Sequence, residues 1–372
     1  MRFARREEMG RALGLAALAC CLASAALPQK QKKDETQTLQ LPRDLPTTVE
    51  GDPRRLAFLV SPLSSKGLLS QQVREALKSL SHEAKGDPIL KIRAFVAGSG
   101  DARRVRDIVS EVFGDRKLPL PVLSLVQAGG LPGGAQVELE AIAAARKDVN
   151  PLGIAYLSAQ EATADDPAAP MPPLAAKSLA QLRVALEAAG SAPSDVVRIS
   201  CFLSSLDELA PVGQLVVQAY PGAAADFIQT QRAPARSLAA CEAVAKLRRD
   251  PGTRLTVLNP AGLPAAPGVS GIALVASPRV VLTGTQVSFG FEEKDARLAF
   301  QRLQKALEQD GVSLHDVACA HFYPLASGIA AQVEKVRGEF FAPASPPATS
   351  LLLFEGLPSM NAGFAMDVVA VK

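Results

Sequence analysis

"AQLRVALEAAGSAPSDVVRISCFLSSLDEL", residues 180–209, predicts a helix that ends near Gly190 and a strand that follows it after a short turn. Its first half spaces apolar residues three and four positions apart, which places them on one face of a helix. Its second half is rich in β-branched and apolar residues, as strands are. The same order of helix, glycine and strand occurs at 71–98 and at 296–325. One pattern that recurs in this way indicates internal repeats.

A larger unit surrounds each of these stretches. A short apolar strand precedes the helix, and a second helix and two closing strands follow the central strand. Phe95, Phe202 and Phe322 are interpreted as the same position in the three central strands. The pattern predicts an α+β fold in which each unit forms one sheet with both helices on one face. The predicted repeats are 55–148, 149–255 and 256–372.

The first 28 residues predict a signal peptide. Four arginines precede an apolar run, "ALGLAALACCLASAAL", and small residues near Ala25 and Ala26 suit cleavage. We therefore expect an exported protein, in a bacterial periplasm or secreted, with no transmembrane span in the mature chain. An amphipathic first helix and lipid attachment at Cys20 or Cys21 are the alternatives. Residues 29–54 are polar and proline-punctuated, which predicts a flexible linker.

Charge and cysteine content exclude several classes of function. The formal net charge of +3 includes four arginines and two glutamates of the leader, so the remainder is close to neutral. Proteins held to nucleic acid by phosphate contacts carry a strong positive charge, so we expect no nucleic-acid partner. Outside the leader the cysteines are Cys201, Cys241 and Cys319. An odd and widely spaced set is not a disulfide framework, so we expect buried thiols.

The unit resembles the RidA/YjgF family of reactive-intermediate deaminases. The resemblance rests on residues 180–209 and on two closing stretches, "VELEAIA" (137–143) and "PATSLLLFEGLP" (347–358), and it extends over 55–372. Members are homotrimers with a central β-barrel, helices outside, and a ligand cleft at each subunit interface. The resemblance therefore implies three tandem chorismate-mutase-like β-α-β-α-β-β repeats that form an intramolecular pseudo-trimer. We expect such a chain to be a monomer with internal threefold pseudo-symmetry.

One position decides whether the family's chemistry is retained. Deaminating members carry an arginine there that binds the substrate carboxylate through two hydrogen bonds. The corresponding residues here are Leu123, Ala225 and Thr349. The tetrapeptide "PARS" does occur at 234–237, and a rival register would place its arginine, Arg236, at this position in the second repeat. The spacing to the closing acidic residue favours Ala225, with Arg236 near the start of the last strand.

Other positions of the family pattern are retained in part. A glutamate that helps to orient the attacking water corresponds to Glu138, but to Ala240 and Ala365 in the other repeats. A small polar residue in the opening strand corresponds to Ser61, Ser158 and Gly284. Glu138 is a candidate general base if its pKa is raised, and an exposed cross-strand partner otherwise.

The three histidines, His82, His315 and His321, lack metal-ligand spacing, so we expect no metal and no cofactor. His321 is interpreted either as a cleft residue or as a packed core histidine.

Two functions from different classes follow from this pattern. The first is a binding protein whose clefts hold an unidentified small molecule or meet a protein partner, without deamination. The alternative is a hydrolytic deaminase that converts 2-aminoacrylate-type enamines and imines to keto acids and ammonia, acting at one cleft through Arg236 and Glu138. An endoribonuclease role is a third interpretation, which the near-neutral charge disfavours.

Overall fold

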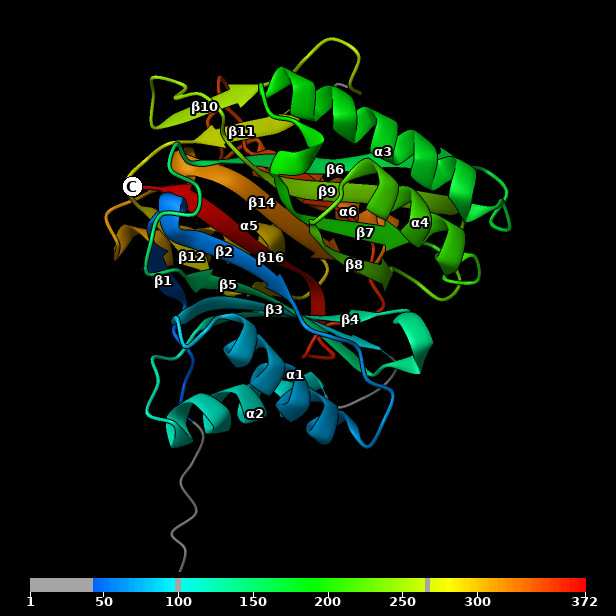
Figure 1. The fold of residues 1–372 in the computed structure, drawn as a ribbon, viewed down its shortest axis with the longest axis horizontal. Coiled ribbons are helices and arrows are strands. Elements are labelled where there is room, and N and C mark those ends of the chain that lie inside the picture. Colours follow the sequence, from blue (N-terminus) through cyan, green and yellow to red (C-terminus); the bar gives the residue numbers. More distant parts are fainter. Residues whose placement is uncertain (1–42, 98–101, 265–267) are drawn as a thin grey trace, which may run out of the picture. The chain divides into compact units, whose positions relative to one another are not determined.

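The computed structural model describes residues 43–97, 102–264 and 268–372. Within these ranges the chain forms a mixed α+β fold with three sheets and six α-helices (Figure 1). The predicted signal peptide lies outside the described residues. In the described part of the chain, no helix is both long and apolar enough to cross a bilayer. Four short 3-10 turns complete the elements: Pro53–Arg55, Pro132–Gly134, Pro193–Asp195 and Leu314–Asp316.

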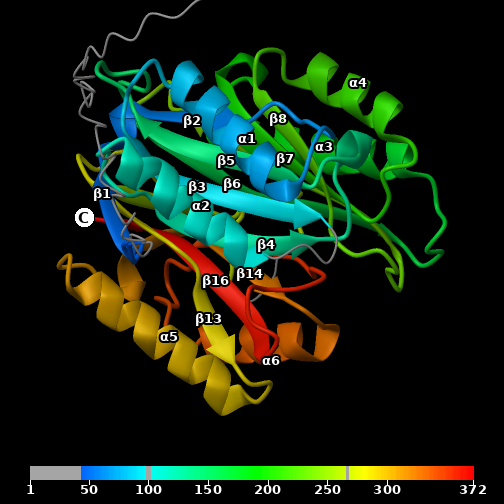
Figure 2. The ribbon, with the colours of Figure 1, turned by 90° about the horizontal axis from the view of Figure 1, so that it is seen from below.

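The first sheet has four strands, and both of its helices cover one face (Figure 2). Valine, leucine and isoleucine side chains of the helices pack there against the central strands, as the three- and four-residue spacing predicts. In spatial order the strands are β2 (Leu56–Val60), β5 (Val137–Ala144), β3 (Ile89–Ala97) and β4 (Val122–Ala128). The helices are α1 (Leu69–Glu83) and α2 (Ala102–Asp115).

The second sheet repeats this order and adds two strands at one edge. In spatial order its strands are β10 (Leu255–Leu258), β11 (Ile272–Val275), β6 (Ile154–Ala164), β9 (Ser237–Lys246), β7 (Val196–Leu203) and β8 (Ala224–Gln229). Its helices are α3 (Met171–Ala188) and α4 (Leu209–Ala219). Gly190 follows α3 with a φ of 71°, a left-handed conformation that glycine adopts readily and that ends the helix.

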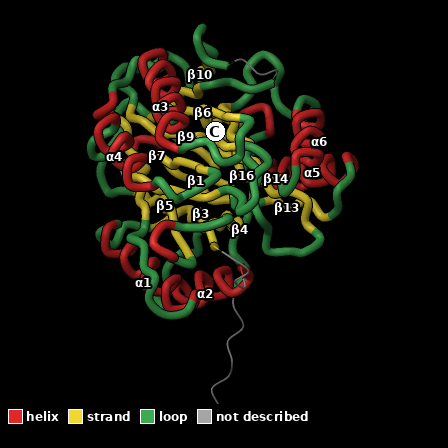
Figure 3. The backbone as a smooth tube through the Cα atoms, turned by 90° about the vertical axis from the view of Figure 1, so that its right-hand side faces the viewer, coloured by secondary structure: helices red, strands yellow, loops and turns green. Residues whose placement is uncertain are grey.

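The third sheet again contains the same four-strand order, with β1 added at one edge. Its path is β1 (Thr48–Gly51), β12 (Val280–Thr283), β16 (Ala362–Val371), β14 (Val317–Pro324) and β15 (Ala348–Leu351), and β13 (Gln286–Phe289) also pairs with β16. Its helices are α5 (Glu293–Glu308) and α6 (Ser327–Arg337). Figure 3 shows the helices outside the strands.

Strand register corrects one sequence interpretation. Phe95 lies opposite Glu138, and Phe202 lies opposite Ala240. In the third sheet it is Tyr323, not Phe322, that lies opposite Ala365. The interpretation of Phe322 was therefore wrong by one residue. Because successive residues of a strand face opposite sides, Phe322 packs under its own helices while Tyr323 joins Phe95 and Phe202.

Two sheets each gain a strand from a segment that comes, in the sequence, just before the opening strand of another unit. The strand β1 pairs with β12 of the third sheet, although it lies before β2 of the first. It occupies residues 48–51 of the segment expected to be a flexible linker. In the same way β11, which precedes β12, pairs with β6 of the second sheet. Each of these edges is thereby covered, which removes a free row of backbone donors and acceptors.

The predicted closed β-barrel does not form. The hydrogen-bonded ladders of the described residues make three separate sheets, connected by isolated bridges such as Gln127 with Gly356, Gly130 with Gln229 and Ser270 with Ala348. The faces turned away from the helices nevertheless pack together. They make two apolar clusters with members from all three sheets, one that contains Phe58, Tyr156 and Val369, and one that contains Phe95, Phe202 and Tyr323.

The expectation that all cysteines outside the leader are thiols was wrong for two of them. Cys201 on β7 and Cys241 on β9 lie directly opposite each other, with their Cα atoms 4.2 Å apart, and form a disulfide. Both are fully buried in the core of the second sheet, and Cys319 is a buried free thiol. Sequence spacing could not show this pairing, because the two residues are 40 positions apart and only the register brings them together.

Thiol titration tests this disulfide. For protein that lacks residues 1–28, we expect only the thiol of Cys319 to react after denaturation without reductant, and all three cysteines to react after reduction. Three reactive thiols before reduction, in protein purified from an oxidising compartment, would show that the bond does not form.

Candidate functional site

The three sheets meet along three seams that follow one another in a cycle. Strand β2 lies against β8, β6 against β15, and β12 against β4. We name these seams 1–2, 2–3 and 3–1 after the sheets that they join. Each seam brings an opening strand of one unit to the strand that follows the second helix of the next. These are the strands that carry the predicted cleft residues.

Seam 3–1 joins two of those residues through their backbones. Gly284 lies beside Leu123, and the Thr285 N–H donates to the Leu123 carbonyl at 3.1 Å. A Cβ atom at Gly284 would lie 2.9 Å from that carbonyl oxygen, so only glycine allows this approach. The Leu123 side chain packs in the apolar core of the first sheet. At this seam the predicted cleft is filled by protein.

Seam 2–3 is closed by hydrogen bonds. The Ala159 N–H, next to Ser158, donates to Ser350 Oγ at 3.0 Å, and the Ser270 N–H donates to the Pro347 carbonyl at 3.1 Å. Thr349 is buried, and its hydroxyl donates to the same Pro347 carbonyl at 3.0 Å. The Thr349 side chain is therefore bonded to the backbone of its own unit.

Seam 1–2 also has an uncharged residue at the predicted position. Ala225 lies opposite Ile199 in the β7–β8 pair, and its side chain packs against the core of the second sheet. Leu123 and Thr349 hold the equivalent places, opposite Ile92 and Ala320. The Ser61 hydroxyl accepts from the Leu139 N–H of its own sheet at 3.0 Å.

Arg236 lies outside the seam position. It is exposed and stands immediately before β9, whereas Ala225 lies within β8. The charge of Arg236 acts on a carboxyl group of β6. Burial raises the pKa of Glu161 on β6, and the positive charge of Arg236 opposes that shift. Arg236 thus precedes β9, whereas Ala225 lies in β8, and β7 lies between these two strands.

Glu138 is buried, which excludes its interpretation as an exposed cross-strand partner. Only 2% of the residue is exposed, and its Oε2 atom has no hydrogen-bond partner. Burial, aided by the negative charge of Glu140, raises the pKa of Glu138 to about 8. The carboxyl group is therefore mostly protonated at neutral pH. Such a pKa suits proton transfer, but the residue lies beneath the surface.

Between the two apolar clusters lies a layer of buried charges that the sequence analysis did not identify. Arg93 donates to both oxygens of Glu140, at 2.7 and 2.9 Å, and to Glu242 at 2.7 Å. Arg198 donates to Glu140 at 2.8 Å and approaches Glu242 at 3.5 Å. Ser200 donates to Glu140 at 3.0 Å. These bonds connect the first sheet to the second.

The third sheet completes this ionic layer through Asp367. Its carboxylate accepts from Lys91 of the first sheet, from Tyr323 Oη at 2.8 Å, and lies 3.1 Å from His321 Nδ1. His321 Nε2 also lies 3.4 Å from Glu242 of the second sheet. His321 is therefore a core histidine in an ion-pair network.

Burial and the neighbouring charges together decide which of the buried acids are ionised. Burial raises the pKa of Glu242 and Asp367, but the neighbouring cations outweigh it, and both are held well below the usual range. Burial also opposes ionisation of Glu140, yet Arg198 and Arg93 lower its pKa to about 2. For Asp226, burial and the negative charges of Glu140 and Glu138 outweigh the positive charge of Arg93 and raise its pKa well above normal.

The register shows that the layer consists of equivalent positions. Lys91, Arg198 and Cys319 form one set, and Arg93, Ser200 and His321 form a second. The third set is acidic in every sheet: Glu140, Glu242 and Asp367. The acidic set could have been found in the sequence, because one acidic residue occurs at the same place in the last strand of each repeat. The cations could not, because charged residues that alternate with apolar ones are equally typical of a strand with one face in water.

The interior of the layer is too small for an organic substrate. A cavity of about 20 Å³ remains there, lined by residues that include Tyr156, Arg198 and His321. That volume is on the scale of a single water molecule. The ionic layer therefore joins the sheets, and its contribution is structural.

Removing one cation should show how strongly the layer is coupled. Arg93→Met removes the cation that bonds most closely to both Glu140 and Glu242, so we expect a loss of about 3–5 kcal/mol in unfolding free energy. The exposed Arg104, which pairs with Glu111 at 3.2 Å, is the control. Arg104→Met should cost at most about 1 kcal/mol. Urea denaturation of both variants measures the difference, and equal losses would contradict a coupled layer.

Glu138 should make stability depend on pH. The folded state keeps this carboxyl protonated up to about pH 8, whereas the unfolded chain ionises near the ordinary value of 4.5. The unfolded state thus binds fewer protons between these values, and Glu138 lowers stability as pH rises, by about 1.4 kcal/mol per pH unit. Glu138→Gln should remove this decrease. Urea midpoints at pH 5, 6.5 and 8 test it, and parallel pH profiles for the two proteins would refute the assignment.

Comparisons with known proteins agree with the fold of the first unit. Residues 63–145 match the family model described as Endoribonuclease L-PSP, which includes α1, α2 and the strands β3, β4 and β5. No curated protein matches the chain.

Among solved structures, a protein of unknown function of the conserved Rid family from Yersinia pestis is 19% identical, with 32% of this chain and 100% of that chain covered and a TM-score of 0.29. A member of the YjgF/YER057c/UK114 family from Mycobacterium tuberculosis is 22% identical, with 32% and 99% covered and a TM-score of 0.24. The match over residues 63–145 supports the resemblance of the first unit to the family that the sequence indicated.

Proposed function

We propose that this chain is an exported binding protein built from three fused RidA-like units, and that it does not deaminate enamines at its seams. The recurrence of one strand order in three sheets supports the fusion. The cycle of seams, in which β2, β6 and β12 meet β8, β15 and β4, supports a pseudo-trimeric arrangement. A chain that already contains three units needs no other subunit, so the proposal includes a monomer.

The observation that carries this proposal is the chemistry of one position. The residues Leu123, Ala225 and Thr349 occupy equivalent places in the three sheets and carry no charge. Leaving a substrate carboxylate unpaired costs about 2–5 kcal/mol, which is tens- to thousands-fold in rate. Two of the seams are also closed by hydrogen bonds between units.

Export is supported by the disulfide as well as by the leader sequence. Cys201 and Cys241 are paired within one sheet. Structural disulfides persist in oxidising compartments and are rare where thioredoxin and glutathione keep thiols reduced. A bond in the core therefore fits a protein that folds outside the cytoplasm.

The alternative is a deaminase that retains one active seam. The raised pKa of Glu138 favours it, because a group that titrates near neutrality can transfer protons. Two observations disfavour it. Glu138 is buried, and the exposed Arg236 lies outside the seam position. The family description names an endoribonuclease, but the formal charge of +3 over 372 residues is small for a nucleic-acid-binding protein.

An enamine hydrolysis assay distinguishes the two functions. The protein without residues 1–28 is mixed with freshly generated 2-aminoacrylate, and the loss of the enamine is followed against buffer. We expect no acceleration, because the three equivalent positions hold Leu123, Ala225 and Thr349, which carry no charge to bind the carboxylate. Glu138→Gln and Arg236→Ala are measured beside the control Arg232→Ala.

Acceleration that is lost in Arg236→Ala or Glu138→Gln, but kept in Arg232→Ala, would establish the deaminase and reject the binding protein. Acceleration in all four proteins would also reject the proposal, and would show that another group holds the substrate. Only a rate equal to that in buffer supports the proposed function.

A further inference from the structure

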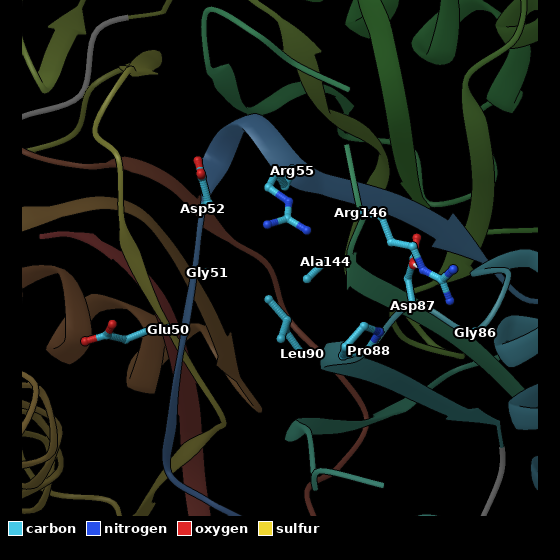
Figure 4. Close-up of a pocket in the computed structure, with 10 residues that line it drawn as sticks. All are labelled: Glu50, Gly51, Asp52, Arg55, Gly86, Asp87, Pro88, Leu90, Ala144 and Arg146. Atoms are coloured by element: carbon cyan, nitrogen blue, oxygen red, sulfur yellow. Dashed lines mark ion pairs between the residues drawn. The ribbon is translucent and has the colours of Figure 1, made fainter. Parts of the chain in front are cut away.

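A surface cavity of about 430 Å³ lies where β1 passes the beginning of β3 and the end of β5 (Figure 4). It is lined by Glu50, Gly51, Asp52, Arg55, Gly86, Asp87, Pro88, Leu90, Ala144 and Arg146. None of the seam residues Leu123, Ala225 and Thr349 lines it. The cavity is therefore distinct from the clefts that the family resemblance implies.

One arginine in this cavity is held in place without a side-chain ion pair. Arg55 is half-buried, and its Nε donates to the Ala145 carbonyl at 2.6 Å. In the described parts of the chain, its two terminal nitrogens have no hydrogen-bond partner. Figure 4 shows the guanidinium group beside the space above Leu90 and Ala144. A fixed guanidinium edge of this kind can bind a carboxylate through two parallel hydrogen bonds.

The acidic residues around the cavity are already paired. Glu50 is bonded to Lys372 and lies 3.3 Å from Arg279, and Asp52 is bonded to Arg54 at 2.6 Å. These bonds, with the hydrogen bond from the cation as the main cause in each case, lower the pKa of both acids.

The third acid, Asp87, lies 3.2 Å from Arg146. Each of these carboxylates has its ion pair with another residue, and Arg55 acts on Asp52 only through its charge, so the terminal nitrogens of Arg55 are left for a ligand.

The rest of the lining includes apolar atoms. Leu90, Pro88 and Ala144 lie together on one side of the cavity. Gly51 lies against Leu90, where an added Cβ would approach the Leu90 side chain to 3.0 Å. A ligand that fits these surroundings has an anionic group for Arg55 and a short apolar body for the hydrocarbon surface.

We propose that this cavity binds a small monocarboxylate with an apolar body, with Arg55 as the residue that holds the carboxylate. The site does not depend on the proposed function of the seams, because it shares no residue with them. The proposed site lies beside β1, the strand that precedes the first repeat.

Binding of hexanoate tests the site, with uncharged hexanamide as the matched ligand. Backbone NMR of isotope-labelled protein without residues 1–28 follows both titrations. We expect hexanoate to bind with a dissociation constant on the order of millimolar, and hexanamide at least about tenfold more weakly. The shifted signals should be those of Arg55, Leu90 and Ala144.

Substitution of the arginine separates charge from geometry. Arg55→Gln should weaken hexanoate binding by about tenfold or more, and Arg55→Lys should weaken it less, because the charge remains but the fork of donors is lost. Arg248→Gln, an exposed arginine that pairs with Asp195, is the control and should bind as the unchanged protein does. Thermal unfolding of each variant confirms that it is folded.

Three results would overturn the proposal: no hexanoate binding, equal binding of hexanoate and hexanamide, or unchanged binding by a folded Arg55→Gln variant. Shifts confined to Leu123, Thr349 or their neighbours would likewise reject this site. Because enamine hydrolysis is measured separately, failure of hexanoate to bind leaves the result at the seams intact.

Discussion

The buried ion pairs of Arg93 are the interaction on which the arrangement of the three sheets depends. This side chain belongs to the first sheet and bonds to Glu140 of its own sheet and to Glu242 of the second. His321 extends the network from Glu242 to Asp367 in the third. Buried charges must be paired, and these pairs form because the three sheets meet in this arrangement. The guanidinium also lies 5.2 Å from the centre of the Phe95 ring, which joins the layer to the apolar cluster beside it.

Such a layer is easier to build in a fused chain than in a symmetric trimer. Symmetry would place three copies of one residue at each set of equivalent positions, and like charges would then face each other around the axis. Here one set contains Arg93, Ser200 and His321, and another contains Lys91, Arg198 and Cys319. These unequal residues place Lys91, Arg93, Arg198 and His321 beside the acidic set, Glu140, Glu242 and Asp367. Unequal residues at equivalent positions thereby allow a buried and charged layer between the three sheets.

The candidate site was only partly predictable from the sequence. The choice of Ala225 over Arg236 followed from the number of residues that a hairpin needs, and in the structure Ala225 lies within β8, opposite Ile199 of β7. The contacts that close the seams could not be predicted from the sequence by such a count. They depend on close approaches such as that of Gly284 to Leu123, residues 161 positions apart whose contact arises from packing between units.

Local patterns in the sequence determined the order of helices and strands, the helix faces and the recurrence of the unit, because apolar spacing and glycine positions act within a few residues. The tertiary structure alone decided what depends on pairing between distant strands. It placed Glu138 in the interior, paired Cys201 with Cys241, and kept the three sheets from closing into one barrel. It also turned the charges of Arg93 and Arg198 inward. A charged residue in an alternating strand suits water or a buried partner equally well, and only the neighbouring sheets supply that partner.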